Sequence, residues 1–216
     1  MSKPLKIAAK LNLTLLFFSF LYVFIVGLVE DASIRSYIYS FVFTAIFVIS
    51  ARISSKKNGK KYFIYAGVAT AVMWLSDYLD FEYLTLVSYI ISILFLTLIL
   101  TKIVIRISSS QRVGLLEFVE AINVYFLMGV IGSVLFRIVH FFAPGESFNI
   151  PGETIEPTID LIYFSFVTIS TLGYGDITPI DPFAKSLAIF LSIAGQLYLT
   201  MIIAVLVGKY LSEKQK

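Results

Sequence analysis

Six long apolar runs constrain this chain more than any other feature of its sequence, because each is long enough to cross a lipid bilayer as a helix. The runs cover residues 11–29, 33–51, 62–81, 83–105, 119–142 and 183–208. A helix of about 20 apolar residues spans the hydrocarbon core of a bilayer. The composition agrees, since 58% of the 216 residues are hydrophobic and 14% are charged. The sequence therefore predicts an all-α membrane protein with six transmembrane helices.

The first run has an alternative interpretation as a secretory signal, since basic residues precede it. Its apolar part is longer than the roughly 7–15 residues of such signals. Leu28-Val29-Glu30-Asp31 also makes a poor cleavage site, because it lacks small residues. We therefore expect the first run to be kept as a transmembrane helix.

A seventh apolar segment, residues 158–170, is too short to cross a bilayer. About thirteen residues of helix rise only about 20 Å. This length suits a re-entrant half-helix, which enters the membrane and returns to the same side. Pro157 and Thr158 predict its start, with Thr158 as the N-cap. The segment leads directly into Thr171.

The sequence Thr171-Leu172-Gly173-Tyr174-Gly175-Asp176 lies between two long apolar runs. Backbone carbonyl groups inside a membrane can replace the hydration shell of a cation. Gly173 and Gly175 permit backbone angles that a β-carbon disfavours, so successive carbonyls can point toward one axis. The motif therefore indicates a site that handles an ion within the membrane.

From about residue 119 to 211, the chain resembles the pore module of the tetrameric potassium-channel family. That module consists of an outer helix, a turret, a pore helix, a selectivity filter and an inner helix. The resemblance is carried by Tyr163-Phe164-Ser165-Phe166-Val167-Thr168-Ile169-Ser170-Thr171-Leu172-Gly173-Tyr174-Gly175-Asp176, followed by Ile177-Thr178-Pro179. A Thr-x-Gly-Tyr-Gly-Asp string after a short aromatic helix and before a long apolar one is a highly specific pattern.

The resemblance implies that residues 171–175 form the selectivity filter, called the filter below. It implies K⁺ coordination by the backbone carbonyls of Thr171, Leu172, Gly173 and Tyr174, while Gly175 completes the filter. The Thr171 hydroxyl is expected to complete the innermost site. Leu172 stands where Val or Ile is commoner in the family. Because the carbonyl does the coordinating, we expect K⁺ selectivity to survive this departure.

The resemblance also implies a set of residues that support the filter, namely Tyr163, Phe164, Thr168 and Asp176. The Tyr163 hydroxyl is expected to bond Asp176. Phe164 offers no hydrogen-bond donor, so the ring of aromatic support should be thinner than in relatives with tryptophan. We expect this difference to affect filter stability more than selectivity.

Gly195 lies in the last apolar run, at the distance after the filter where the family often places a gating hinge. Glycine within a helix costs about 1 kcal/mol relative to alanine and makes bending easier. Close packing between helices is an equally weighted alternative, because small residues let helices approach in membranes. The hinge interpretation predicts that Gly195→Ala reduces open probability and leaves selectivity intact. Asp181 and Pro182 predict the start of this inner helix.

Charges between the apolar runs predict the orientation in the membrane. Basic residues collect in alternate loops, which are cytoplasmic by the positive-inside rule. They are Lys3, Lys6, Lys10, Arg52, Lys56, Lys57, Lys60, Lys61, Lys102, Arg106 and Arg112. The other loops carry Glu30, Asp31, Asp77, Asp80, Glu82, Glu146, Glu153, Glu156, Asp160, Asp176 and Asp181, with Arg35, Arg137 and Lys185 as basic residues. We expect a multi-pass protein of a plasma membrane, with both termini cytoplasmic and, from its compact layout, a prokaryotic source.

The runs divide into two predicted domains. Residues 1–112 form a four-helix transmembrane domain whose layout resembles a voltage sensor, and residues 113–216 form the pore domain. A voltage sensor places Arg or Lys at about every third residue of its fourth helix. Residues 83–101 contain neither. The sequence therefore predicts weak or absent voltage dependence.

The function implied by the resemblance is passive, K⁺-selective conduction through a filter formed by four copies of the chain. A weakly selective cation channel or a non-conducting accessory membrane subunit stays open as an alternative. Polar groups within the runs form no nucleophile–base pair or metal-ligand set, so no enzyme activity is expected. We expect no cofactor, with K⁺ only as the permeant ion. The expected partners are further copies of the chain and the lipid bilayer, and no nucleic acid.

Overall fold

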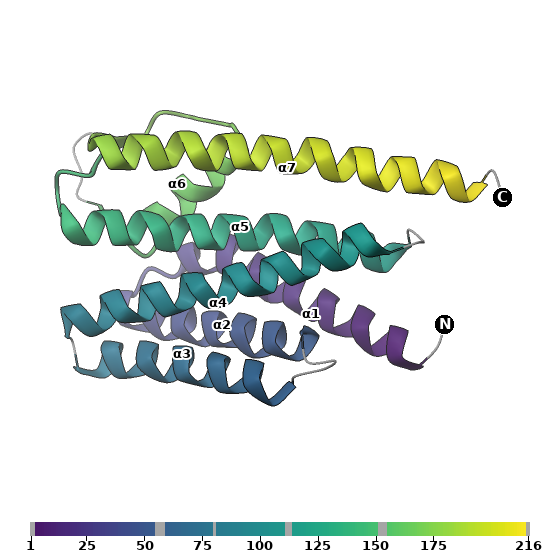
Figure 1. Cartoon of the computed structure of the whole chain (residues 1–216). Coiled ribbons are helices and arrows are strands. Elements are labelled where there is room, and N and C mark those ends of the chain that lie inside the picture. The colour runs from purple at the N-terminus through teal and green to yellow at the C-terminus, as the bar shows by residue number, and fades with distance from the viewer. Residues whose placement is uncertain (1–2, 55–58, 80, 111–113, 151–154, 215–216) are drawn as a thin grey trace.

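The computed structural model describes residues 3–54, 59–79, 81–110, 114–150 and 155–214. These residues form an antiparallel bundle of long helices with one short helix inserted (Figure 1). The helices are α1 (Lys3–Phe24), α2 (Ala32–Ile53), α3 (Gly59–Leu79), α4 (Glu82–Ser109), α5 (Leu115–Phe142), α6 (Asp160–Ile169) and α7 (Pro182–Lys214), with a 3-10 turn, η1 (Val26–Leu28), after α1.

Among the described residues, five stretches of helix are long and apolar enough to cross a membrane, which is consistent with the predicted all-α membrane protein. They are Lys6–Leu28, Ala32–Ile53, Glu82–Ser109, Leu115–Phe142 and Pro182–Lys209. The predicted run 62–81 is the helix α3, which has 21 residues but is not one of these five. Trp74, Ser76 and Asp77 lower its hydropathy.

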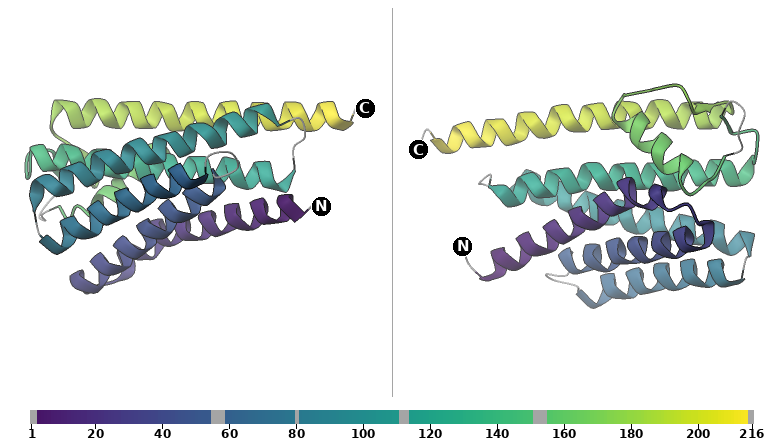
Figure 2. Two further views of the ribbon diagram at one scale, coloured as in Figure 1. Left: turned by 60° about the horizontal axis from the view of Figure 1, so that its bottom comes forward. Right: turned by 180° about the vertical axis from the view of Figure 1, so that it is seen from behind.

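The helix α5 lies at the centre of the bundle and packs against α1, α4, α6 and α7. In its most apolar stretch 61% of residues are buried, whereas the corresponding share for α7 is 17%. Figure 2 shows α6 lying beside both α5 and α7 when the bundle is seen from behind. Because only 17% of this stretch of α7 is buried, most of the α7 surface is exposed in the single chain.

Of the two N-caps predicted from the sequence, Asp181 of α7 is present and Thr158 of α6 is not. The Asp181 carboxylate accepts from the amides of Phe183 and Ala184, with N···O distances of 2.6 and 2.9 Å, which confirms the predicted start of α7. The predicted N-cap Thr158 is wrong, because α6 begins at Asp160 and its N-cap is Ile159. The Thr158 carbonyl is instead held by a side chain of α5, as described below.

A short antiparallel β-bridge, which the sequence did not predict, lies beside α6. The strands β1 (Phe148–Asn149) and β2 (Thr178–Pro179) pair Phe148 with Pro179 and Asn149 with Thr178. The Ile180 amide extends the pairing by donating to the Ser147 carbonyl over 2.8 Å. The bridge therefore ties the segment before α6 to the segment after the filter.

Polar contacts join the two predicted halves of the chain, whose proposed boundary at residues 112 and 113 lies outside the described residues. Tyr22 of α1 bonds Ser133 of α5 over 2.9 Å between their hydroxyl oxygens. The Lys209 ammonium of α7 donates to three carbonyls at the end of α4, with N···O distances of 2.7–2.9 Å. A cation at a helix C-terminus satisfies unpaired carbonyls and complements the helix dipole.

The charges used to predict orientation fall partly outside the described residues, namely Lys56, Lys57, Asp80, Arg112 and Glu153. In Figure 1, α1 begins and α7 ends at the same end of the bundle. Because the long helices alternate in direction, the described basic residues Lys6, Arg52 and Arg106 lie toward this end as well. The short helix α6 lies in the opposite half.

Candidate functional site

The candidate site is the loop of residues 171–176, which follows α6 directly and leads to β2. All six residues are exposed in the single chain. Two of them carry large apolar side chains that stand open, since Leu172 is 57% exposed and Tyr174 is 68% exposed. The backbone of the loop contacts α6, whereas the side chains of Leu172 and Tyr174 are exposed in the single chain and could contact another copy.

Two glycines of α5 form the seat on which α6 packs. A β-carbon at Gly129 would lie 2.4 Å from the ring of Phe166, and one at Gly132 would lie 2.4 Å from the Ser165 hydroxyl oxygen. The Ser165 hydroxyl also donates to the Gly129 carbonyl over 2.7 Å in a buried position. Small residues allow helices to approach this closely in membranes. The position of α6, and of the loop after it, thus depends on these two glycines.

The backbone of the filter has positive φ at every second residue. The φ angles are 60° at Thr171, 57° at Gly173 and 80° at Gly175. Carbonyls of an ordinary extended strand point alternately to opposite sides, and a change of hand at alternate residues turns them toward one side. Among the described residues, Thr171 is the only non-glycine residue with positive φ. A β-branched residue in this region is strained, and such strain clusters at functional sites.

The amide groups of the filter point back to α6, whereas its carbonyls do not. The amides of residues 171–173 donate to the carbonyls of Thr168 and Val167, with N···O distances of 3.0–3.4 Å. No hydrogen bond found among the described residues ends on a carbonyl oxygen of residues 171–174. A backbone carbonyl without a partner needs water or a cation. In the described part of the chain, four successive carbonyls of this loop thus have no hydrogen-bond donor found.

Side-chain hydroxyls close the junction between α6 and the filter. The Thr171 hydroxyl donates to the Ser170 carbonyl over 2.6 Å, and the Ser170 hydroxyl donates to the Val167 carbonyl over 3.2 Å. Thr168, a predicted support residue, lies in the last turn of α6, where its carbonyl receives the Thr171 amide. These bonds join the end of α6 to the first filter residue.

The predicted hydrogen bond between Tyr163 and Asp176 is present. The Tyr163 hydroxyl donates to one carboxylate oxygen of Asp176 over 2.5 Å, and the other oxygen accepts from the Ile177 amide over 2.9 Å. The Tyr163 hydroxyl is the main cause that holds the pKa of Asp176 below its ordinary value, and the amide adds to it. Asp176 therefore stays ionised and fastens the outer end of the loop to α6.

Tyr163→Phe is expected to make the filter more sensitive to acid. Removing the hydroxyl removes the main donor to the charged carboxylate, so the pKa of Asp176 rises. A group with a lowered pKa in the folded state stabilises that state at high pH and loses this effect as pH falls through its folded pKa. Titration of external pH against current should show block at a higher pH in Tyr163→Phe than in the wild type. Equal midpoints would contradict the role of Tyr163.

Two other predicted site residues face the scaffold. Phe164 is buried, and its ring centroid lies 4.8 Å from that of Phe136 in α5 and 5.4 Å from that of Phe148 in β1. Phe164 therefore packs against the scaffold, and its role in supporting the filter stays a prediction. Gly195 lies within α7, where it meets the backbone of Ile169 at the end of α6. Its role as a hinge stays a prediction.

Sequence reasoning missed the residues that seat α6. Gly129 and Gly132 are three residues apart and therefore share a helix face, which is a signal for close helix packing that was readable in the sequence. The sequence placed Arg137 among the basic residues of the acidic loops and did not predict that it is buried and contacts the segment before α6. No sequence pattern signals that contact.

Comparisons with known proteins match the part of the chain that contains this loop. A family model described as an ion channel matches residues 92–212, which is more than half of the chain. Two-pore potassium channel 5 of Arabidopsis thaliana is 31% identical over 92 residues, covering 40% of this chain and 22% of that protein. Two pore potassium channel a of Oryza sativa subsp. japonica is 32% identical over 108 residues, covering 50% and 26%.

A shorter match, 44% identical over 46 residues, is to potassium channel K1 of Plasmodium berghei, covering 21% of this chain and 2% of that protein. The matches thus span about a quarter or less of these relatives' lengths. No solved structure matches the chain. The relatives come from plants and a Plasmodium species, so they lend no support to a prokaryotic source. The family model, which covers more than half of the chain, shows that the chain belongs to this ion-channel family, and the relatives to which it is similar are named as potassium channels.

Proposed function

We propose that four copies of this chain surround one axis and form a K⁺-selective channel that conducts passively. The observation that carries the proposal is the filter backbone, with positive φ at residues 171, 173 and 175 and four successive carbonyls without a hydrogen bond among the described residues. Carbonyls of Thr171, Leu172, Gly173 and Tyr174 would replace the hydration shell of K⁺. One chain supplies one such strand, so a closed ring needs further copies.

The exposed surface of α7 supports assembly of several copies. Large apolar side chains stand open along the helix, including Phe183, Phe190, Leu197 and Met201, each more than half exposed. In an assembly with α7 nearest the axis, some of these residues would contact neighbouring copies and others would line the conducting path. The opposite side of the bundle, formed by the first four helices, would face lipid.

The proposed topology has six spans and one re-entrant helix. The helix α3 is 21 residues long, which is sufficient to cross the hydrocarbon core as the sixth span. With ten residues, α6 is too short and would enter and return on the side of the filter. Both termini would then be cytoplasmic, at the basic end of the bundle, in a plasma membrane.

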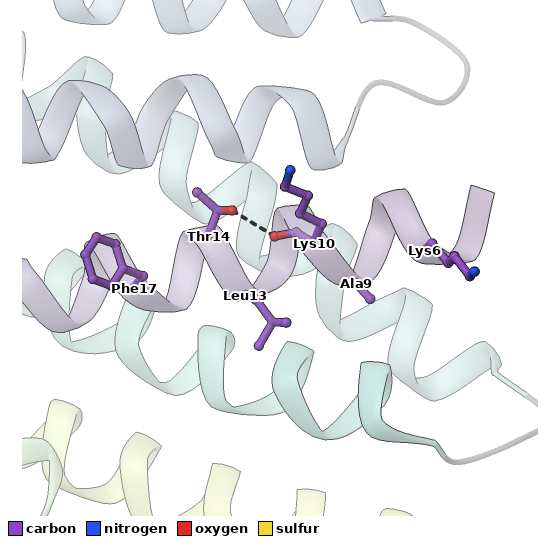
Figure 3. A pocket seen from close by; sticks show the side chains of 6 residues that line it. All are labelled: Lys6, Ala9, Lys10, Leu13, Thr14 and Phe17. Carbon is purple, nitrogen blue, oxygen red and sulfur yellow. Dashed lines mark hydrogen bonds between the residues drawn. The ribbon is translucent and has the colours of Figure 1, made fainter. Parts of the chain in front are cut away.

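The surface of α1 fits a membrane interface at this basic end. A shallow hollow of about 490 Å³ is lined by Lys6, Ala9, Lys10, Leu13, Thr14 and Phe17 on one face of α1 (Figure 3). Leu13 and Phe17 are about half exposed, which suits contact with acyl chains. Lys10 and Lys6 lie about one and two turns closer to the chain start than Leu13, where ammonium groups reach lipid headgroups.

Strong voltage gating is not part of the proposal, because the basic residues near the end of α4 have structural partners. The Lys102 ammonium lies 3.5 Å from the centroid of the Tyr62 ring. The Arg106 guanidinium pairs with the Glu120 carboxylate at an N···O distance of 2.7 Å. Neither residue is placed along the span as a row of gating charges would be.

The experiment that tests the function is the reversal potential of purified protein in planar bilayers with K⁺ on one side and Na⁺ on the other. We expect reversal near the K⁺ equilibrium value for the wild type and loss of this selectivity for Tyr174→Asp. Tyr78→Asp is the matched control, since Tyr78 is 84% exposed at the end of α3. Equal K⁺ and Na⁺ permeability of the wild type would indicate a weakly selective cation channel. A wild type without current under any condition would indicate an accessory subunit.

A further inference from the structure

Two arginines from different helices hold the segment that precedes α6. This segment, residues 156–158, directly precedes the first turn of α6, which begins at Asp160. Arg35 comes from α2 and Arg137 from α5, so they reach the segment from both predicted halves of the chain. Neither arginine was assigned a role from the sequence.

Arg137 binds the segment through its backbone. Its Nε donates to the Pro157 carbonyl and its Nη2 to the Thr158 carbonyl, both over 3.1 Å. The residue is only 4% exposed, and its guanidinium lies 4.5 Å from the centroid of the Tyr39 ring in α2. A charged side chain within an apolar bundle is costly and is kept where its partners and function require it. The planar fork of arginine matches two acceptors and stacks on an aromatic face, which a lysine does not reproduce.

Arg35 binds the same segment through the side chain of Glu156. Its Nη2 lies 2.7 Å from a carboxylate oxygen of Glu156, while its Nη1 donates to the carbonyls of Val29 and Glu30. The Glu156 amide donates to the Asp160 carboxylate over 2.6 Å. Arg35 thus connects the loop after α1 to the first residue of α6.

The C-terminal end of α6 is joined to the filter. A displacement of the start of this short helix would therefore displace the filter as well. The helix has ten residues, and the filter amides bond the carbonyls of Val167 and Thr168 near its end. A rotation or shift of α6 must therefore move the filter backbone. Coordination by carbonyls depends on where those oxygens lie.

We propose that Arg35 and Arg137 form a clamp, called the pore-helix clamp, that positions α6 and thereby sets ion selectivity. Through Arg35, the clamp makes the four-helix half of the chain part of the scaffold for the filter, and Arg137 of α5 is the main positioning residue. This inference rests on the proposed function, because selectivity has meaning only for a conducting filter. Its structural content, that the clamp fixes the start of α6, is testable without conduction.

The experiment compares Arg137→Met, Arg137→Lys and Glu156→Gln with the wild type. Arg52→Gln is the control, since Arg52 is an exposed arginine of α2 whose side chain has no hydrogen bond or ion pair found among the described residues. The first readout is the permeability ratio of K⁺ to Na⁺ under bi-ionic conditions. The second is hydrogen–deuterium exchange of residues 156–170 in purified protein, which needs no current.

We expect Arg137→Met to lower the permeability ratio roughly tenfold or more, which is the scale of losing one hydrogen bond to a charged group. Arg137→Lys should restore only part of it, because lysine keeps the charge and loses the fork. Glu156→Gln, which changes a carboxylate that is 44% exposed, should shift the ratio less and in the same direction. Exchange at the start of α6 should accelerate in the same order, and Arg52→Gln should match the wild type.

The outcomes separate the two proposals. A wild type that conducts without preferring K⁺ defeats the proposed function, while exchange in the variants still tests the clamp. A K⁺-selective wild type with unchanged selectivity and exchange in Arg137→Met and Glu156→Gln defeats the clamp alone. If Arg137→Met does not fold, Glu156→Gln decides, because that side chain is not in the core. Full rescue of selectivity by Arg137→Lys would show that charge, and not the fork, is what acts.

Discussion

Replacing Gly195 with alanine is expected to displace the pore helix and impair the filter. A β-carbon at this position would lie 2.4 Å from the carbonyl oxygen of Ile169 and 2.5 Å from its side chain. Ile169 is the last residue of α6 and stands two residues before Thr171. A backbone oxygen cannot rotate aside as the end of a side chain can, so α7 or α6 must move. Such overpacking costs about 1–3 kcal/mol per site, and every subunit of an assembly carries the site.

Gly208→Ala provides the matched control, because Gly208 lies in the same helix and a β-carbon there would meet nothing within 4 Å. Alanine favours helix by about 1 kcal/mol over glycine, so this control should leave stability unchanged or slightly raised. Gly195→Ala should lower both the thermal stability of the purified protein and the K⁺/Na⁺ permeability ratio. A Gly195→Ala channel with normal stability and selectivity but reduced open probability would support the hinge interpretation instead.

Local chemistry explains what could be predicted from the sequence. The glycines of the filter predicted unusual backbone angles at 173 and 175, and both have positive φ. The hydrogen bond of Asp181 at the start of α7 was predictable from neighbouring residues, whereas the bond of Tyr163 with Asp176, 13 residues apart, was expected from the family resemblance. Apolar runs located the long helices, because burial in lipid selects residues by type and length.

Contacts between distant parts of the chain were not predictable in the same way. Thr171 has a positive φ that its β-branched side chain opposes, so its neighbours must impose that conformation. The clamp contact of Arg137 joins residues 20 and 21 positions apart across a turn of chain. Whether α3 crosses the membrane also stays a prediction, since α3 is not among the five helices that are long and apolar enough to do so and polar side chains such as Ser76 are buried. Each case depends on tertiary packing, which a single sequence does not encode as a pattern.

Replacing Glu120 with leucine is expected to destabilise the bundle strongly. Glu120 of α5 is 1% exposed, and its carboxylate pairs with the Arg106 guanidinium of α4 at N···O distances of 2.7 and 2.9 Å. It also accepts from the Asn12 amide of α1 over 3.3 Å. Removing one partner of a buried ion pair costs about 3–5 kcal/mol, because the other charge is left without compensation. Thermal unfolding in detergent should show a clearly lower midpoint, whereas Glu146→Leu, at an exposed turn, should not.

A double-mutant cycle separates the pair from its surroundings. An ion pair replaced on both sides by apolar residues of similar volume is often neutral or stabilising. Glu120→Leu with Arg106→Leu should therefore recover most of the stability that Glu120→Leu loses. The Arg106 side chain is 31% exposed, so water compensates part of its charge and the recovery should fall short of complete. If the stability losses of the two single variants simply add, the ion pair contributes no coupling energy. The stability of the junction between α1, α4 and α5 must then come from its apolar contacts. The Asn12 amide would keep its hydrogen bond to the Ala8 carbonyl in every variant.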